Sequence, residues 1–178
     1  KTCEKYMSSN DLSFTHLYNA MSDNNHRNPG VLSAALNNGK FAEIICDLNH
    51  VSEEAILIAK KCIPDLYAIT DSIAASGMKD GGYKFANVEI EKKNNKVYLN
   101  GTNTLAGSVV NMHDTFLNLL KMKISIQDAV RMTSYSASKF LKKEDIGVID
   151  IEKKANFLIL DHEFNIKSIY LNGKLING

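Results

Sequence analysis

The sequence has no tryptophan, two prolines and three cysteines among its 178 residues. The cysteines, Cys3, Cys46 and Cys62, are odd in number and form no CxxC pair. This pattern argues against a disulfide framework and against a structural zinc knuckle. An excess of one charge is also missing, because 21 Lys and Arg residues balance 20 Asp and Glu residues for a net charge of +1. The chain therefore offers no basic face for nucleic acid.

Long hydrophobic runs are absent as well. No apolar run approaches the ~20 residues that a membrane-spanning helix needs. The first residues, KTCEKYMSSND, contain no signal-peptide core, so we expect a cytoplasmic protein without a membrane segment. The segment Lys1 to Ser9 has helical character but no N-cap, which indicates the tail of a helix whose beginning is missing.

What the sequence does contain is three apolar runs that each end in polar side chains. They are Leu12 to His16, Phe41 to Cys46, which is followed by DLNH, and Leu66 to Asp71. The second run is apolar on both faces, as in parallel strands that helices cover. Helical patterns separate the runs, so the order strand, helix, strand predicts an α/β protein with a parallel sheet. His16, His50 and Asp71 should then meet at one edge of this sheet.

The two helices between these strands are predicted from different signals. The first covers Val31 to Leu36 and is closed by asparagines and Gly39. Ser52 caps the second, which has acidic residues in its first turn, lysines in its last and Pro64 after its end. Its apolar residues recur every three or four positions and predict one buried face, made of Ala55, Ile58, Ala59 and Cys62. Cys46 and Cys62 are both expected to be small buried hydrophobes.

The second half of the chain changes period. Two alternating runs, Tyr83 to Glu91 and Lys96 to Asn100, predict a β-hairpin. The small-residue loop Gly101 to Ser108 leads into a long helix, and its backbone amides could bind an anion or a polar ligand. The remaining expected elements are helices at Val109 to Met122, Ile126 to Thr133 with Ser125 as its cap, and Ser136 to Leu141, and strands at Ala155 to Asp161, Ile166 to Leu171 and after Gly173.

The residues at the strand ends each allow two interpretations. His16 could be a metal ligand or a general base, or only a hydrogen-bonded histidine at a sheet edge. Asp71 could be a general base, or the N-cap of a helix that follows it. Asp47, Asn49 and His50 form a polar cluster that could bind a ligand or cap the local backbone.

Other histidines carry weaker signals. His26 and Arg27 precede a turn and could bind a phosphate, for which the planar guanidinium is well suited, or could be a solvated loop. His113 lies inside a predicted helix and His162 in a turn between Asp161 and Glu163. We expect no functional role for either histidine.

Five motifs resemble one known family when they are read together. The first is THLYNAM at Thr15 to Met21, which is followed by HRNPG. DLNH at Asp47 to His50 is similar to a DGxH pattern, and ITDSIAASG at Ile69 to Gly77 is similar to TDAxxxAG. GTNTLAGS is similar to GTLAGS. The tail, Ile146 to Asp161, is similar to the closing strand motif of the amidohydrolase superfamily. In this order the motifs resemble the N-acetylglucosamine-6-phosphate deacetylases, which are metal-dependent enzymes of that superfamily.

The resemblance implies a role for most of the candidate residues. His16 would be a metal ligand, and Asp71 would be the general base and acid. The resemblance implies a divalent metal, with zinc as the first candidate and iron, manganese or cobalt as alternatives. Arg27 would bind the phosphate, across a homodimer in the full-length enzyme. The implied substrate-binding residues are Asn19, Ala20, Arg27, Asp47, Leu48, Asn49, His50, Leu105, Ala106 and Gly107.

The implied reaction is hydrolysis of N-acetylglucosamine 6-phosphate to glucosamine 6-phosphate and acetate. Asp71 would take a proton from water and return it to the leaving amine, while His50 would hold the sugar or the carbonyl oxygen. The implied fold is the C-terminal portion of a TIM-like β/α barrel over residues 1–145, with a hairpin insertion at about 83–100. Residues 146–178 would add strands of a small β-sandwich domain.

The sequence also departs from the family pattern. Leu48 stands where the family has glycine, and its side chain could crowd the pocket. Ser72 stands where the family has alanine, and Tyr135-Ser136 stands where it has Asn-Pro. The family also draws a carboxylate and a second histidine from earlier strands, and only the last three barrel strands are found here. We therefore expect the C-terminal part of a larger enzyme. One alternative is an inactive fragment or structural half, and a weaker one is a dihydroorotase-like amidohydrolase, against which THLYNAM and GTNTLAGS argue.

Overall fold

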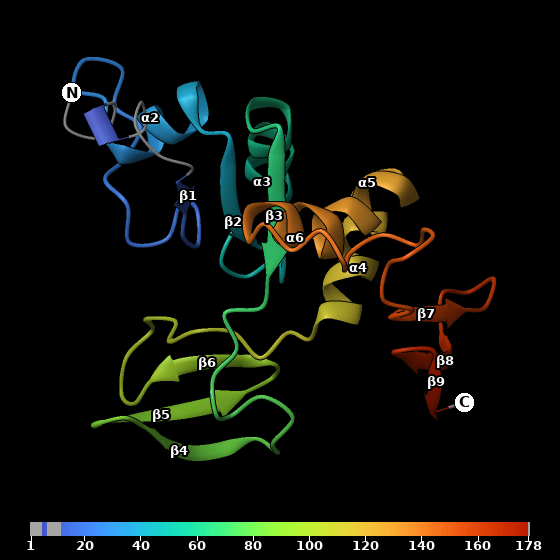
Figure 1. Ribbon diagram of the computed structural model, residues 1–178. Helices are drawn as coiled ribbons and strands as arrows, with labels where there is room; N and C mark the ends of the chain where they lie inside the picture. Colours follow the sequence, from blue (N-terminus) through green and yellow to red (C-terminus); the bar gives the residue numbers. More distant parts are fainter. Residues whose placement is uncertain (1–4, 7–11, 178) are drawn as a thin grey trace.

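The computed structural model describes residues 5–6 and 12–177, and it arranges them as three small sheets and a group of helices (Figure 1). The helix expected at Lys1 to Ser9 falls largely outside this range, as does Cys3. Within the described residues, no helix is both long and apolar enough to cross a membrane.

The first sheet contains the three strands that the sequence predicts. β1 (Ser13–Phe14), β2 (Phe41–Ile45) and β3 (Asp65–Ile69) lie side by side in that order, and both pairings are parallel. The helix α2 (Val31–Asn38) connects β1 to β2, and α3 (Glu53–Cys62) connects β2 to β3. The parallel strand, helix, strand arrangement is therefore confirmed, and the segments after all three strands share one edge of the sheet.

The side chains of alternate residues in β2 lie on opposite faces of the sheet. Ala42 and Ile44, together with Cys46 after the strand, are fully buried in the main hydrophobic core. Helix residues such as Ile56 and Leu119, both also fully buried, belong to the same core. Burial of an Ile or Leu side chain of this kind contributes about 1.5 to 3 kcal/mol, so this helix-covered face is what holds the sheet in place.

The buried face of α3 is rotated from the predicted one. The residues that α3 buries are Ile56 and Ala59, and Ile63 continues this row just after the helix. Ile58 is 51% exposed and Cys62 is also exposed, so the prediction that Cys62 is buried is wrong. Of the predicted face, Ala59 is buried and Ala55 packs partly against the core, so the buried face is shifted and not opposite. The stretch contains apolar residues on two adjacent faces, and periodicity alone does not decide between them. The cap by Ser52 is confirmed, because its hydroxyl accepts the Ala55 N–H.

The predicted hairpin is a three-stranded antiparallel sheet. Its strands are β4 (Gly81–Phe85), β5 (Val88–Lys93) and β6 (Lys96–Leu99). The run expected as one strand folds back on itself after Phe85, where Ala86 takes a left-handed φ of 51°. The second turn is as expected, with Asn94 and Asn95 at φ 52° and 59°, a conformation that asparagine tolerates well.

The helices that follow differ from expectation mainly at their boundaries. α4 (Met112–Lys121) begins three residues later than predicted, because the Asn111 side chain caps it by accepting the Asp114 N–H. α5 (Ile126–Val130) starts at the predicted Ser125 cap. It then runs without a break through the π-helical turn η1 (Arg131–Tyr135) into α6 (Ser136–Phe140), so the two predicted helices are one.

A buried carboxylate connects this continuous helix to the sheet. Asp65, at the start of β3, is 3% exposed and lies 2.7 Å from the Lys139 Nζ and 3.6 Å from an Arg131 nitrogen. Phe140 adds ring contacts to Phe41 and Tyr67 at centroid distances of 5.3 and 5.9 Å. These contacts fix η1 and α6 against the amino ends of the strands, away from the edge where His16 and Asp71 lie.

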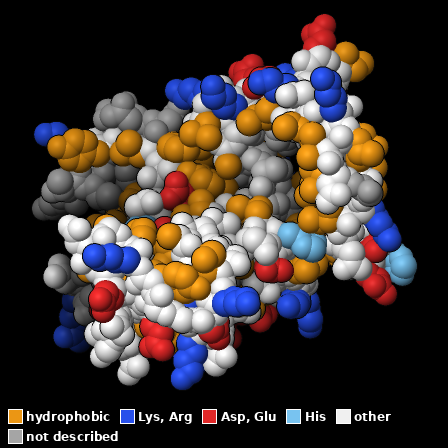
Figure 2. Space-filling model, turned by 90° about the horizontal axis from the view of Figure 1, so that it is seen from below, with side chains coloured by type: hydrophobic (Ala, Val, Ile, Leu, Met, Phe, Trp, Pro, Cys, Tyr) orange, Lys and Arg blue, Asp and Glu red, His pale blue; other side chains and the backbone are white. Residues whose placement is uncertain are grey.

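The three strands predicted near the C-terminus are present and form the third sheet, which is antiparallel. β7 (Phe157–Leu160), β8 (Ile166–Leu171) and β9 (Lys174–Asn177) pair in chain order. His113 in α4 contacts the loop between β7 and β8, because its Nε2 lies 2.7 Å from the Phe164 carbonyl oxygen. The sheet keeps hydrophobic side chains exposed at the right of Figure 2, each between 40 and 61%: Leu158, Ile159, Ile166, Leu171, Leu175 and Ile176.

Candidate active site

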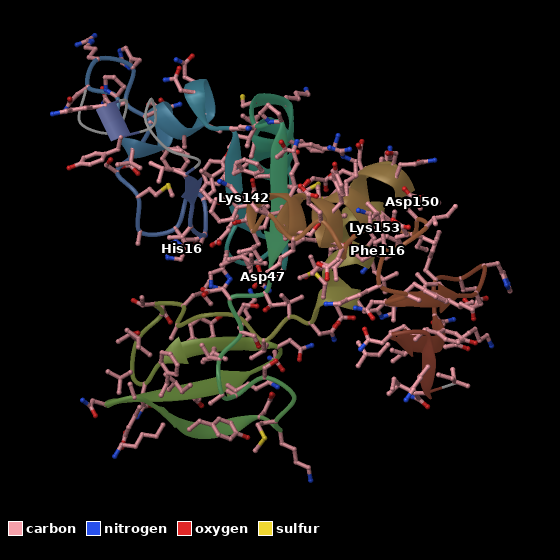
Figure 3. The ribbon with its side chains drawn as sticks, viewed as in Figure 1. His16, Asp47, Phe116, Lys142, Asp150 and Lys153 are labelled. Carbon is pink, nitrogen blue, oxygen red and sulfur yellow. The ribbon has the colours of Figure 1, made fainter. Side chains whose placement is uncertain are left out.

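The edge of the parallel sheet carries a left-handed residue after each strand. The φ angles are 30° at His16, 61° at Leu48 and 47° at Asp71. Non-glycine residues rarely adopt positive φ, each at a cost of about 1 kcal/mol or more, and such strain concentrates at functional sites. Figure 3 shows His16 and Asp47 at this edge. The left-handed φ also gives a physical reason why glycine suits the position of Leu48.

Within the described residues, one ring nitrogen of His16 is engaged and the other makes no hydrogen bond. Its Nδ1 lies 3.1 Å from the Asn19 carbonyl oxygen, which can only accept, so Nδ1 carries the proton in this contact. The lone pair of Nε2 is then available to a ligand, as a metal-binding histidine requires. The Asn19 side chain donates to the carbonyls of His16 and Leu17, both at 3.3 Å, so it shapes this turn.

A hydrogen-bond network beneath His16 was not predicted. The Glu43 carboxylate accepts hydrogen bonds from the Thr15 hydroxyl at 2.7 Å and from the Tyr67 hydroxyl at 3.1 Å. Ser13 lies 2.9 Å from the same tyrosine oxygen, so the network joins all three strands. Burial, together with the charge of Glu43, raises the pKa of Tyr67 to about 12 and keeps it a donor. A lone carboxylate inside an otherwise apolar strand was the available sequence signal.

The Asp47 carboxylate organises the loop after β2. Its Oδ1 accepts the backbone N–H groups of Asn49 and His50, each at 2.9 Å, and its Oδ2 lies 2.8 Å from the His50 Nδ1. Both side chains are largely buried, with 8% of Asp47 and 9% of His50 exposed. Of the two interpretations that the sequence left open for this cluster, local backbone capping by Asp47 is therefore observed.

Asp71 presents a free carboxylate. It is exposed, and its side chain makes no hydrogen bond or ion pair with the described part of the chain. No helix follows it, so the alternative interpretation of Asp71 as an N-cap is wrong. Its backbone is held instead, since its carbonyl accepts the Ser108 N–H at 2.9 Å and the Ile73 N–H donates to the Ser108 carbonyl at 3.2 Å.

The small-residue loop reaches Asp71 through the second sheet. Leu105 forms an isolated bridge with Tyr98 in β6, and the Ala106 N–H donates to the Val97 carbonyl at 3.0 Å. Gly107 follows with a φ of 71°, and a Cβ there would lie 3.3 Å from the Asp71 carbonyl oxygen. The structure thus brings the predicted loop Leu105 to Gly107 against Asp71, and it does so through residues some 30 positions away in sequence.

Other predicted residues contribute less to this edge. Ala20, with a φ of 54°, and Arg27 are both exposed, and the Arg27 guanidinium makes no hydrogen bond or ion pair with described residues. The backbone N–H of Arg27 donates to Asn25 Oδ1 at 2.9 Å, which orders its turn. Leu48 is 41% exposed.

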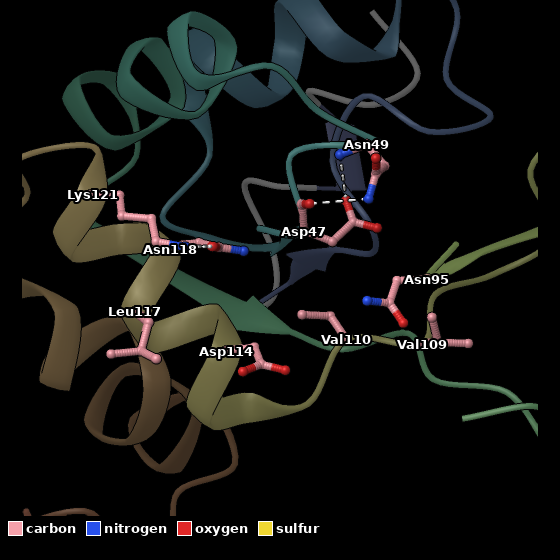
Figure 4. Close-up of a pocket in the computed structure, with 9 residues that line it drawn as sticks. All are labelled: Asp47, Asn49, Asn95, Val109, Val110, Asp114, Leu117, Asn118 and Lys121. Atoms are coloured by element: carbon pink, nitrogen blue, oxygen red, sulfur yellow. Dashed lines mark hydrogen bonds between the residues drawn. The ribbon is translucent and has the colours of Figure 1, made fainter. Parts of the chain in front are cut away.

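A cavity of about 390 Å³ lies beside this edge, between the loop after β2 and α4 (Figure 4). Asp47 and Asn49 form one wall, and Asp114 and Asn118 of α4 form another. The Asn118 amide donates to the Cys46 carbonyl at 3.0 Å and so fixes α4 next to the loop. His16, His50 and Asp71 are not among its lining residues, so of the candidate site residues only Asp47 and Asn49 border this cavity.

The described residues do not assemble a metal site by themselves. No group of three or more His, Cys, Asp or Glu side chains in that part of the chain is placed to hold an ion. Structural and catalytic zinc sites use three or four protein ligands, whereas His16 is a single imidazole. The expected metal therefore does not fit the described residues alone.

Comparison with known proteins decides the family. The amidohydrolase family model matches residues 13–176. The chain belongs to the amidohydrolase family. One related protein is the N-acetylglucosamine-6-phosphate deacetylase of Bos taurus. The alignment with it covers 98% of the present chain, at 30% identity.

Solved structures of the same kind have the same fold. The N-acetylglucosamine-6-phosphate deacetylase of Pasteurella multocida matches 99% of the amidohydrolase chain with a TM-score of 0.92 and 27% identity. That of Thermotoga maritima matches 97% with a TM-score of 0.90 and 28% identity. The chain spans 45% of the Bos taurus protein and 47 and 48% of these two structures, which is about half of their length.

Proposed function

We propose that this chain supplies part of the active site of an enzyme that hydrolyses N-acetylglucosamine 6-phosphate to glucosamine 6-phosphate and acetate. The free carboxylate of Asp71, held at the carboxyl edge of a parallel sheet, carries the proposal. An edge of this kind is where α/β enzymes place catalytic groups. The names of its relatives supply the substrate.

In the proposed reaction, Asp71 is the general base and then the general acid. Its carboxylate takes a proton from water as the water oxygen attacks the acetamide carbonyl carbon. The same proton is returned to the nitrogen as the C–N bond breaks, which releases the amine and acetate. An unpartnered, exposed carboxylate suits this role because no internal hydrogen bond has to be broken before it accepts the proton.

The finer architecture is also a proposal. The parallel sheet β1 to β3, with α2 to α6, would be the C-terminal portion of a β/α barrel within residues 1–145. The strands β7 to β9 would belong to a small β domain within residues 146–178. The exposed hydrophobic side chains of β7 to β9 support this division, because a sheet of this kind normally packs one face against other structure.

The residues that contact a metal and a phosphate follow from the same proposal. His16 would contribute one ligand, through Nε2, to a divalent metal, with zinc as the first candidate. The other ligands of this metal would have to come from outside the described residues. Such a metal would act as a Lewis acid toward the reacting groups. The free guanidinium of Arg27 would bind the sugar phosphate, within a homodimer of the complete enzyme.

The experiment measures acetate release from N-acetylglucosamine 6-phosphate with zinc, manganese or cobalt present. It compares the 178-residue chain alone with the chain supplied with the N-terminal portion of a related deacetylase. Activity only in the second case indicates that the chain is a structural half, which is the alternative from the sequence. Absence of activity in both, for a complex shown to assemble, would contradict the proposed function.

The role of Asp71 has its own test in the active assembly. Asp71→Asn should lower kcat by about 100- to 10,000-fold, because the amide keeps the shape but cannot accept a proton. Folding stability should not change, since the carboxylate has no partner in the described structure. Asp150→Asn, an exposed carboxylate elsewhere in the chain, is the control. A variant of Asp71 with kcat near wild type would remove it from the mechanism.

A further inference from the structure

We infer that Asp47 is a positioning residue, which holds the imidazole of His50 in the Nδ1–H tautomer and leaves Nε2 as the atom that meets the ligand. The resemblance had assigned Asp47 to substrate contact, together with its neighbours. The geometry assigns it a different role, one step behind the substrate. The catalytic consequence rests on the proposed function, whereas the tautomer itself does not.

The Asp47 carboxylate has little capacity left for a ligand. An ionised carboxylate offers about four acceptor positions, and three are filled by the Asn49 N–H, the His50 N–H and the His50 ring. The side chain is also only 8% exposed. A substrate hydroxyl could reach it only by breaking contacts that the loop itself depends on.

The direction of the hydrogen bond between Asp47 and His50 follows from the charge state of Asp47. Burial raises the pKa of this carboxyl group, but the hydrogen bonds from His50 and Asn49 outweigh burial and leave the pKa below its ordinary value of 3.8. Near neutral pH the group is therefore ionised and can only accept. At 2.8 Å, the contact requires a proton on the His50 Nδ1.

The other nitrogen of His50 is left open. Nε2 makes no hydrogen bond with the described residues, although only 9% of the side chain is exposed. In the described chain, the buried side-chain atoms without a hydrogen-bond partner are the Asp65 Oδ1 and the Thr115 hydroxyl oxygen. The His50 Nε2 is not among them, so it is not sealed in the interior. In a neutral imidazole of this tautomer, Nε2 accepts, and it suits a ligand group that donates a hydrogen, such as a sugar hydroxyl or an amide N–H.

The local sequence makes this geometry possible. The carboxylate and the histidine are three residues apart, and Leu48 between them adopts a φ of 61°. The left-handed turn brings the chain back over Asp47, so one side chain caps two backbone N–H groups and reaches the ring. Second hydrogen bonds of this kind fix the tautomer and orientation of functional histidines.

Nitrogen NMR of the 15N-labelled chain tests the inference without any activity measurement. Long-range 1H–15N spectra at about pH 8.5, well above the ordinary histidine pKa of about 6.5, distinguish the protonated ring nitrogen from the bare one. His50→Gln assigns the signals among the five histidines. We expect His50 to be mainly in the Nδ1–H form.

Asp47→Asn is the decisive variant. Its amide oxygen can keep the two backbone caps, while its NH₂ group now faces Nδ1 and requires that nitrogen to accept. The ratio of the Nδ1–H to the Nε2–H form should therefore fall by about tenfold or more. Asp114→Asn, on the far wall of the neighbouring cavity, is the control and should leave the ratio unchanged. A wild-type His50 in the Nε2–H form, or a ratio that Asp47→Asn does not alter, would overturn the inference.

Activity separates this inference from the proposed function. If the assembled enzyme releases acetate, Asp47→Asn should lower kcat by about 10- to 100-fold with folding retained. The expected tautomer in a protein without deacetylase activity would support the role of Asp47 and contradict the proposed function. Deacetylase activity with His50 in the Nε2–H form would support the proposed function and contradict the role of Asp47.

Discussion

Replacement of Gly107 by alanine should displace the segment that carries Asp71. A Cβ at Gly107 would lie 2.5 Å from the Ile73 Cγ2 and 3.3 Å from the Asp71 carbonyl oxygen. The first distance is too short for two carbon atoms, so either the loop or the Asp71 segment has to move. The φ of 71° adds strain, because a side chain is disfavoured in the left-handed region.

Gly101 provides a matched control for this substitution. Its φ is 73°, nearly the same as that of Gly107, but a Cβ there would have no heavy atom within 4 Å. Gly101→Ala should cost about 1 kcal/mol, which is the left-handed strain reduced by the lower entropy of the unfolded chain. Gly107→Ala should cost the same strain plus about 1 to 3 kcal/mol for the forced contact. The expected total is about 2 to 4 kcal/mol.

The assay is urea unfolding of both variants, with Ile73→Ala added to each in a double-mutant cycle. Ile73→Ala removes the Cγ2 methyl group together with the rest of the side chain beyond Cβ, so it should recover most of the additional loss at Gly107 and none at Gly101. In the assembled enzyme, Gly107→Ala should also lower kcat more than Gly101→Ala. Equal stability losses at the two glycines would refute the argument that the loop at Gly107 sets the position of Asp71.

Three further predictions concern stability and reactivity. The pKa of Asp47 in the folded protein lies below the ordinary value of 3.8. The ionised carboxylate therefore stabilises the fold above pH 3.8, and this stabilisation is lost as the pH falls through the folded-state pKa. Denaturant midpoints should decline more steeply below about pH 4 in wild type than in Asp47→Asn. Iodoacetamide should label Cys62 and spare Cys46, whose pKa burial raises to about 12, and peptide-mapped mass spectrometry measures this; fast labelling of Cys46 would contradict its burial. Asp65→Asn should cost about 1.5 to 3 kcal/mol in urea unfolding, because it removes the charge that Lys139 contacts at 2.7 Å; an unchanged midpoint would show that the contact contributes nothing.

Local patterns in the sequence were sufficient for much of the fold. The parallel order of β1, β2 and β3 followed from apolar runs separated by helical periods. The caps at Ser52 and Ser125 followed from single residues at helix starts, and both form the expected hydrogen bonds. The caps succeed because each hydrogen bond joins residues three positions apart and does not depend on the rest of the fold. The strand order succeeds because the apolar runs and helical periods that indicate it are each visible over a short stretch of sequence.

The tertiary structure decided which faces are buried and which side chains meet. The burial of Ile56 rather than Ile58 depends on how α3 is rotated against the sheet. The hydrogen bonds of Glu43 to Thr15 and Tyr67 join residues 28 and 24 positions away, and they exist only in the observed strand register.

The candidate site shows the same division. The sequence placed His16, His50 and Asp71 at strand ends, because polar residues after apolar runs are visible in the chain itself. It could not show that Asp47 bonds to the ring of His50 or that Gly107 lies against Ile73. Both contacts depend on left-handed turns and on the approach of separate segments, and atomic distances of this kind are set by packing, which a one-dimensional pattern does not contain.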